Sequence, residues 1–197
     1  MLTDSPHISN SLRPDPRRGV TLFELLIVVS VMSILAAIAL PRINLHQFRV
    51  DAGVRVVQST LQQGVRLAIQ RQHDVYVSFD VPGQRVLTVD DRNNNAGADP
   101  DEKVQWRQLE DGVRFASPPA PIPGNPSAAV AGSNIKTING LPSIIFRRDG
   151  AASTDLQVYI TSTRPDAGDF KALSVTRSTG HVAYYSYRAG AWVRGGA

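Results

Sequence analysis

The fold is decided by the stretch Pro16-Arg17-Arg18-Gly19-Val20-Thr21-Leu22-Phe23-Glu24-Leu25-Leu26, which joins a basic leader to an apolar run. From Val20 to Leu40 the chain has 21 residues, and Glu24 is the only ionisable side chain among them. At about 1.5 Å per helical residue, such a run is long enough to cross a bilayer core. A carboxylate inside a membrane span is costly, so it normally has a partner and a purpose. We therefore expect a membrane-spanning helix with a functional acid near its start.

A partner for Glu24 is not found within its own helix. Cleavage after Gly19 would free an α-amino group on Val20, and Glu24 would then be the fifth residue of the product. Here the sequence resembles the type IV pilin and type II secretion pseudopilin family, whose leader ends in glycine and whose mature chain carries Glu at its fifth position. Val20 stands where the family often has Phe or Met. The residues that match the family motif are Arg17, Arg18, Gly19, Thr21, Leu22, Glu24, Leu25 and Leu26.

The resemblance implies two processing steps and a location. A prepilin peptidase would cut between Gly19 and Val20, and the new amine of Val20 would be methylated. Positive residues beside a span stay on the cytoplasmic side, so the arginines of the leader, residues 1–19, orient the chain with its N-terminus in the cytoplasm. We therefore expect a single-pass protein of the bacterial inner membrane with a periplasmic head.

Two other kinds of exported protein share a basic segment followed by an apolar run. An ordinary secretory signal peptide would end in an Ala-x-Ala site, and Ala36-Ala37-Ile38-Ala39 can be read that way. A plain single-span anchor would keep its N-terminus uncut. Neither alternative explains Glu24 or the Gly19-Val20 junction, so the pilin-like interpretation is preferred.

Composition fits a short exported protein with one head domain. Of the 197 residues, about 125 remain after the leader and the helix, which suffices for one compact core. The chain has no cysteine, so the head is held by packing alone, and its formal net charge of +4 is no nucleic-acid signature. The histidines His46, His73 and His181 belong to no catalytic motif, so we expect a protein that is not an enzyme.

The second half of the long helix, residues 41–72, is predicted to be amphipathic. Pro41 removes an amide donor and crowds the preceding turn, which predicts a kink. Together with the span at 20–40, this segment would give the lollipop shape of a pilin, a long N-terminal helix carrying a globular head. Apolar residues recur at spacings of three and four until about Arg71 and form one buried stripe: Val50, Val54, Val57, Leu61, Val65 and Ala68.

Residues 73–197 are predicted to form a β-rich head of antiparallel sheets, so the fold class is α+β. The pair Pro82-Gly83 predicts a hairpin between the first two strands. Five prolines between Pro118 and Pro126 exclude a central strand and predict an exposed loop to about Asn134, either an irregular connection or a contact surface. The predicted strands are 75–79, 85–89, 104–109, 113–115, 144–146, 156–160, 170–175 and 181–187.

The C-terminal half resembles the pseudopilin H and FimT-like group of the same family. The resemblance lies in Phe146-Arg147-Arg148-Asp149-Gly150, the strands after it, and Gly180-His181-Val182. His181 stands where members of the group commonly have arginine. Without the resemblance, the turn residues Asp149-Gly150 and Ser178-Thr179-Gly180 predict a β-meander.

The residues from Asp91 to Glu102 have the spacing of a calcium-binding loop. The sixth position of its register holds Ala96, where such a loop needs glycine, and the flanking residues predict strands rather than helices. Calcium is therefore one interpretation, a solvated hairpin tip is the other, and no further cofactor is indicated. Oxygen-bearing side chains stand at the first, third, fifth, ninth and twelfth positions, which are Asp91, Asn93, Asn95, Asp99 and Glu102.

The tail interleaves aromatic and basic residues able to stack on bases and contact phosphates. A pilus tip that grips DNA would use such a pattern, whereas alternate aromatics on a terminal strand also serve packing. Arg188 and Arg194 are the candidate phosphate contacts. The aromatic residues of the pattern are Tyr184, Tyr185, Tyr187 and Trp192.

The function that follows from these patterns is structural. In a filament, Glu24 of one subunit would neutralise the Val20 amine of a neighbour, and Leu22 to Leu40 would pack helix against helix. The first hypothesis is a minor pseudopilin of the type II secretion system, assembled with other pseudopilins. The second is a FimT-like minor pilin of a type IV pilus, and the third is an exported binding module with an ordinary anchor.

Overall fold

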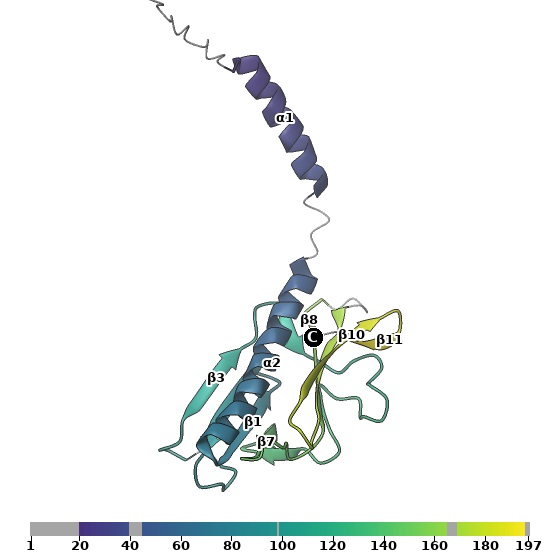
Figure 1. The fold of residues 1–197 in the computed structure, drawn as a ribbon. Coiled ribbons are helices and arrows are strands. Elements are labelled where there is room, and N and C mark those ends of the chain that lie inside the picture. Colours follow the sequence, from purple (N-terminus) through teal and green to yellow (C-terminus); the bar gives the residue numbers. More distant parts are fainter. Residues whose placement is uncertain (1–19, 40–44, 98, 165–168, 196–197) are drawn as a thin grey trace, which may run out of the picture. The chain divides into compact units, whose positions relative to one another are not determined.

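The structure, a computed structural model, describes residues 20–39, 45–97, 99–164 and 169–195 (Figure 1). The chain divides into two compact units, Met1–Ile43 and Asn44–Ala197. The first unit contributes one described helix, and the second contains a helix and antiparallel sheets. The predicted α+β class, an N-terminal helix followed by a β-rich head, is confirmed. The cleavage residue Gly19 and the predicted kink at Pro41 lie outside the described residues.

Helix α1 (Leu22–Ala39) forms the first unit. Thr21 caps it, because the Glu24 amide donates to Thr21 Oγ1 at 3.2 Å, as expected for a Thr-x-x-Glu sequence at a helix start. Its large apolar side chains are exposed on all sides, as Leu22 and Met32 illustrate. A helix that is apolar all round needs a partner surface along its whole length. Among the described residues, no helix combines the length and the apolar character needed to cross a membrane.

Helix α2 (Leu45–Arg71) begins the second unit, and its apolar stripe was correctly predicted. Val50, Val57 and Leu61 are fully buried, whereas Arg55 and Arg66 are exposed. Spacings of three and four place the buried residues on one face of the helix.

The head contains two antiparallel sheets (Figure 1). The first has the order β3-β2-β1-β7-β6, formed by β1 (Asp74–Asp80), β2 (Arg85–Asp91), β3 (Val104–Gln108), β6 (Lys136–Ile138) and β7 (Leu141–Phe146). The second has the order β11-β10-β9-β8-β4, with β5 (Val130–Ala131) also paired to β8; its strands are β4 (Val113–Phe115), β8 (Leu156–Ser162), β9 (Lys171–Val175), β10 (Val182–Arg188) and β11 (Ala191–Arg194).

The main core lies between α2 and both sheets. Helix α2 contacts β1, β2 and β7 of the first sheet and β4, β8, β9 and β10 of the second. Val77, Phe79 and Phe146 from the first sheet and Ile160 and Leu173 from the second are buried in the same cluster as the α2 stripe. One helix face therefore joins the two sheets.

The predicted strands are confirmed with small changes of boundary, and three strands were missed. The hairpin at Pro82-Gly83 is confirmed by the pairing of β1 with β2, and β8, β9 and β10 pair in succession as a meander. The turn at Asp149-Gly150 instead connects the two sheets, because β7 and β8 belong to different ones. The missed strands β5, β6 and β11 are two to four residues long, too short to show a periodic pattern.

The proline-rich segment was predicted to be an exposed loop, and many of its residues are exposed, but part of it packs on the second sheet. The Ile122 amide donates to the Tyr159 hydroxyl at 3.0 Å, and Trp192 Nε1 donates to the Ala120 carbonyl at 2.8 Å. Ile122 also packs against the buried cluster of Tyr159 and Ala172. The prolines exclude a central strand, as expected, but they do not prevent the segment from packing through its side chains and free backbone groups.

The close approach of α2 to the first sheet requires glycine at position 64. A Cβ atom there would lie 2.9 Å from Phe146 Cδ2 and 3.2 Å from Val77 Cγ2. We expect Gly64→Val to lower the free energy of unfolding by about 2 kcal/mol, because overpacking outweighs any gain in helix propensity. The measurement is urea unfolding followed by circular dichroism. The exposed Gln62→Val on the same helix should change the stability by less than about 0.5 kcal/mol, and equal effects would contradict the packing argument.

Candidate functional site

The N-terminal candidate site centres on Glu24 in the first turn of α1. A carboxylate at this end of a helix is favoured by the helix dipole. Its side chain forms no ion pair among the described residues. Val20 is exposed two residues before α1, and Gly19 lies outside the described residues. The acid at the start of an exposed apolar helix is therefore available to a partner molecule.

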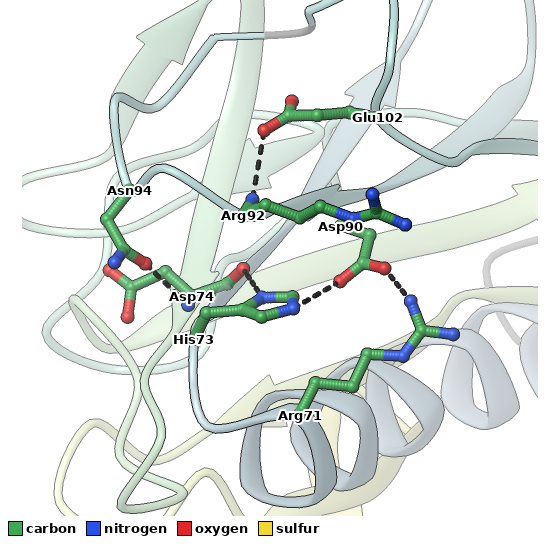
Figure 2. Close-up of polar contacts among 7 residues, drawn as sticks. All are labelled: Arg71, His73, Asp74, Asp90, Arg92, Asn94 and Glu102. Atoms are coloured by element: carbon green, nitrogen blue, oxygen red, sulfur yellow. Dashed lines mark hydrogen bonds and ion pairs between the residues drawn. The ribbon is translucent and has the colours of Figure 1, made fainter.

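A second candidate site lies where α2 ends beside β2 (Figure 2). The buried Asp90 carboxylate forms an ion pair with Arg71, at the last turn of α2, and its other oxygen lies 3.2 Å from His73 Nε2. His73 Nδ1 lies 3.2 Å from the carbonyl of Asp74. The contact between Arg71 and Asp90 thus connects the end of α2 to β2, and it neutralises the buried carboxylate. The sequence analysis missed it, although adjacent acids at the end of a strand were visible as Asp90-Asp91.

Asp91 points to the other face of the same sheet. Successive strand residues alternate between faces, so Asp91 lies on the side of Val89 and Tyr76, away from α2. Asp91 is buried, yet it has no basic partner among the described residues. Among the described residues, Asp90 therefore has a positively charged partner and the adjacent Asp91 has none.

The loop from Asp91 to Glu102, hereafter the 91–102 loop, is organised around its carboxylates. The backbone amides of Asn95 and Ala96 donate to the two oxygens of Asp91 at 3.0 and 2.8 Å. The side-chain amides of Asn93 and Asn95 both donate to Asp99 Oδ2, at 2.6 and 2.8 Å. The side chains at the third, fifth and ninth positions of the loop therefore meet at one point.

Glu102 closes the same loop from its far end (Figure 2). One carboxylate oxygen accepts from the Arg92 amide at 2.9 Å, and the other accepts from the Asp99 amide at 3.1 Å. The Asn94 side chain accepts from the Asp74 amide at 2.8 Å and attaches the loop to β1. The predicted flanking strands are confirmed as β2 and β3.

Tyr76 lies beneath the 91–102 loop on the outer face of the first sheet. Its side chain is fully buried, and its hydroxyl has no hydrogen-bond partner in the described part of the chain. Burial and then the carboxylates of Glu102, Asp91 and Asp99 raise the pKa of Tyr76 to about 12. The phenol is therefore neutral and lies in the field of three acids.

Metal binding stays a prediction for this loop. Among the described residues, no three His, Cys, Asp or Glu side chains are grouped so that they alone could hold a metal ion. The five predicted ligands nevertheless belong to one hydrogen-bonded loop, so any ion would have to use the asparagine side chains as well as the acids.

The tail residues are divided between two faces of the second sheet. Tyr184 packs against the main core, whereas Tyr185 and Trp192 pack with Tyr159 on the opposite face. Arg194 is exposed beside a hollow of about 460 Å³ that Tyr184 also lines. The aromatic residues thus serve packing, and DNA contact by Arg188 and Arg194 stays a prediction.

Comparison with known proteins adds one decisive observation. Residues 15–40 match the family described as the prokaryotic N-terminal methylation motif. The N-terminal segment is a type IV pilin-like methylation motif. This confirms the motif predicted around Gly19 and Glu24, and it leaves the head outside the match. No curated protein matches the chain.

The solved structures similar to this chain include two of the minor pseudopilin EpsH from the type II secretion system of Vibrio cholerae. One crystal structure has 12% sequence identity and a TM-score of 0.47, over 70% of this chain and 94% of that one. The other has 10% identity and a TM-score of 0.41, over 74% of this chain and 95% of that one.

The Asp90 cluster gives a prediction about stability. Asp90 is buried, with 4% of its side chain exposed, whereas Arg71 is 37% exposed. Arg71→Ala should lower the free energy of unfolding by about 2–3 kcal/mol, because it leaves a buried carboxylate without its charged partner. Urea unfolding measures the change. Arg66→Ala, on the exposed side of the same helix, is the control and should cost less than about 0.5 kcal/mol; a similar loss in both variants would show that the ion pair is not stabilising.

Proposed function

We propose that this chain is a pilin-like filament subunit, and the methylation motif at residues 15–40 is the observation that carries the proposal. A prepilin peptidase cleaves between Gly19 and Val20, and the amine of Val20 is methylated. Before assembly the subunit is held in the inner membrane with its head in the periplasm. The exposed, wholly apolar α1 supports this role because it offers a helix surface to neighbouring subunits.

The proposed anchor is the whole apolar run from Val20 to Leu40, of which α1 is the described part. As one helix, the 21 residues of the whole run would span about 32 Å, close to the roughly 30 Å of a bilayer core. The basic leader keeps the N-terminus in the cytoplasm. Extraction of the helix into a filament then moves its apolar surface from lipid to other helices.

Assembly depends on the pairing of two charges. The Glu24 carboxylate of one subunit meets the methylated Val20 amine of a neighbour inside a bundle of apolar helices. In such surroundings an unpaired acid is strongly unfavourable, so the pairing selects one axial register between subunits. The lack of an ion pair to Glu24 among the described residues is consistent with a partner on another molecule.

The narrower proposal is a minor pseudopilin of a type II secretion system, which would assemble with other pseudopilins and promote protein export. The sequence resemblance of the C-terminal half, from Phe146 to Val182, supports it. A FimT-like minor pilin of a type IV pilus is the alternative supported by the same residues. Deletion of the gene should abolish secretion of folded proteins under the first proposal, and piliation or DNA uptake under the second.

The processing proposal predicts a defined new N-terminus. Co-expression with a prepilin peptidase should give a product that begins at N-methylated Val20, because we propose cleavage after Gly19, the residue that ends the basic leader. Intact-mass and N-terminal peptide analysis checks this, with expression lacking the peptidase as the control. A product that starts after Ala39, or no cleavage at all, would contradict the proposal.

The assembly proposal predicts the effect of neutralising the acid. Glu24→Ala should leave processing intact and weaken the contact between subunits by about 3 kcal/mol, or more than 100-fold, because it leaves the neighbour's amine unpaired. Filament yield in microscopy and pull-down measures it. Ser30→Ala, in the same helix, is the control because its hydroxyl bonds only back to the Leu26 carbonyl. Normal filaments from Glu24→Ala would show that the acid does not set the register.

A further inference from the structure

The outer face of the first sheet carries carboxylates that form no ion pair among the described residues. Asp91 and Glu102 are buried, and neither they nor Asp99 forms an ion pair with a basic side chain among the described residues. Asp74 lies directly opposite Asp91 in the register of β1 and β2 and adds another acid nearby. Backbone amides satisfy part of this charge, and among the described residues Arg147 and Arg148 line a hollow with Asp74 and Asn94 without forming an ion pair with the loop acids. Buried carboxylates normally have a basic partner or a metal ion.

The buried phenol of Tyr76 indicates independently that the loop is incomplete. Its hydroxyl is enclosed and has no hydrogen-bond partner among the residues that the structure describes, and the three acids of the loop are its charged neighbours. An unmade hydrogen bond to a buried polar group costs free energy, so such groups usually face a partner. A cation among the acids, with the water that accompanies it, would supply that polar environment.

We propose that the 91–102 loop binds one calcium ion through oxygens at six positions of the loop. Ca²⁺ takes six to eight oxygen ligands and favours a loop in which carboxylates are mixed with amide and backbone oxygens. The ligands are the side chains of Asp91, Asn93, Asn95, Asp99 and Glu102 and the carbonyl of Gly97.

The side-chain amides already converge where the ion would lie. Asn93 and Asn95 both direct an amide nitrogen to the same oxygen of Asp99. An asparagine side chain ends in one nitrogen and one oxygen, so rotation of each amide brings its oxygen to this point, in exchange for the hydrogen bonds that the two oxygens accept from the Asn95 and Gly97 amides. Three carboxylates alone do not form a metal site here, and the two asparagines supply the missing oxygens.

The backbone conformation of Ala96 answers the objection that the sixth position of a calcium loop needs glycine. The sixth position of a calcium loop needs a left-handed turn, which normally requires glycine. Ala96 occupies that position and adopts φ of 56°, and Asn94 adopts the same value. The alanine therefore takes the required conformation, held there by the hydrogen bond from its amide to Asp91. The bound ion would fix the loop over Tyr76 and the outer face of the sheet.

The experiment is calorimetric titration of the full, processed chain in detergent after removal of metals with EDTA. Calcium chloride should bind at one site per chain with a dissociation constant of about 10⁻⁴ M, in the range of extracellular calcium modules. Magnesium chloride should bind at least about 10-fold more weakly, because Mg²⁺ demands a smaller octahedral site. Calcium should also raise the melting temperature, and EDTA should reverse the rise. Absence of calcium binding up to about 10 mM, or equal binding of magnesium, would overturn the proposal.

Variants locate the ion within the loop. Glu102→Gln and Asn93→Ala should each weaken calcium binding about 10-fold or more, and Asn93 is exposed, so its substitution leaves the fold intact. Asp101→Asn is the matched control, because it removes one charge from an exposed position of the same loop outside the register. Ala96→Gly keeps every ligand and should bind calcium at least as tightly. Unchanged affinity in Asn93→Ala and Glu102→Gln, or an equal loss in Asp101→Asn, would overturn the assignment of these ligands.

Discussion

The rest of the head depends on the burial of one face of α2. Val50, Val57 and Leu61 lie in a single core with residues from both sheets, so neither sheet is covered without this helix. Gly53 and Gly64 let the helix approach closely, because a Cβ at either position would meet a core side chain within 3 Å. The helix therefore fixes which face of each sheet is interior, and it thereby fixes where the outward-facing residues of the strands are displayed.

Side chains on a strand alternate between the two faces of the sheet, so this packing gives adjacent residues different surroundings. On β2, Asp90 faces the helix and is neutralised by Arg71, whereas Asp91 faces outward into the 91–102 loop and has no basic partner among the described residues. Asp90 therefore belongs to a structural ion pair, whereas Asp91, the next residue on the strand, is a candidate cation ligand. The buried Tyr76 hydroxyl marks the same outward face.

The two units of the chain serve different requirements. Helix α1 is apolar on every side and carries one acid at its capped start, which suits contacts with other helices. The head buries its apolar residues internally and covers even the second face of its second sheet, with Ile122 and Trp192 attaching the proline-rich segment. The surface proposed for assembly therefore lies on the N-terminal helix.

The sequence by itself determined the features that depend on neighbouring residues. The methylation motif around Gly19 and Glu24, the stripe of α2 and the hairpin at Pro82-Gly83 could all be predicted, because motifs, helix periodicity and turn chemistry are local. The tertiary structure decided what depends on residues distant in the chain. It paired Arg71 with Asp90, packed the proline-rich segment on the second sheet, and placed Ala96 in a left-handed turn above Tyr76. No local pattern records these contacts, since they arise only when the sheets fold against α2.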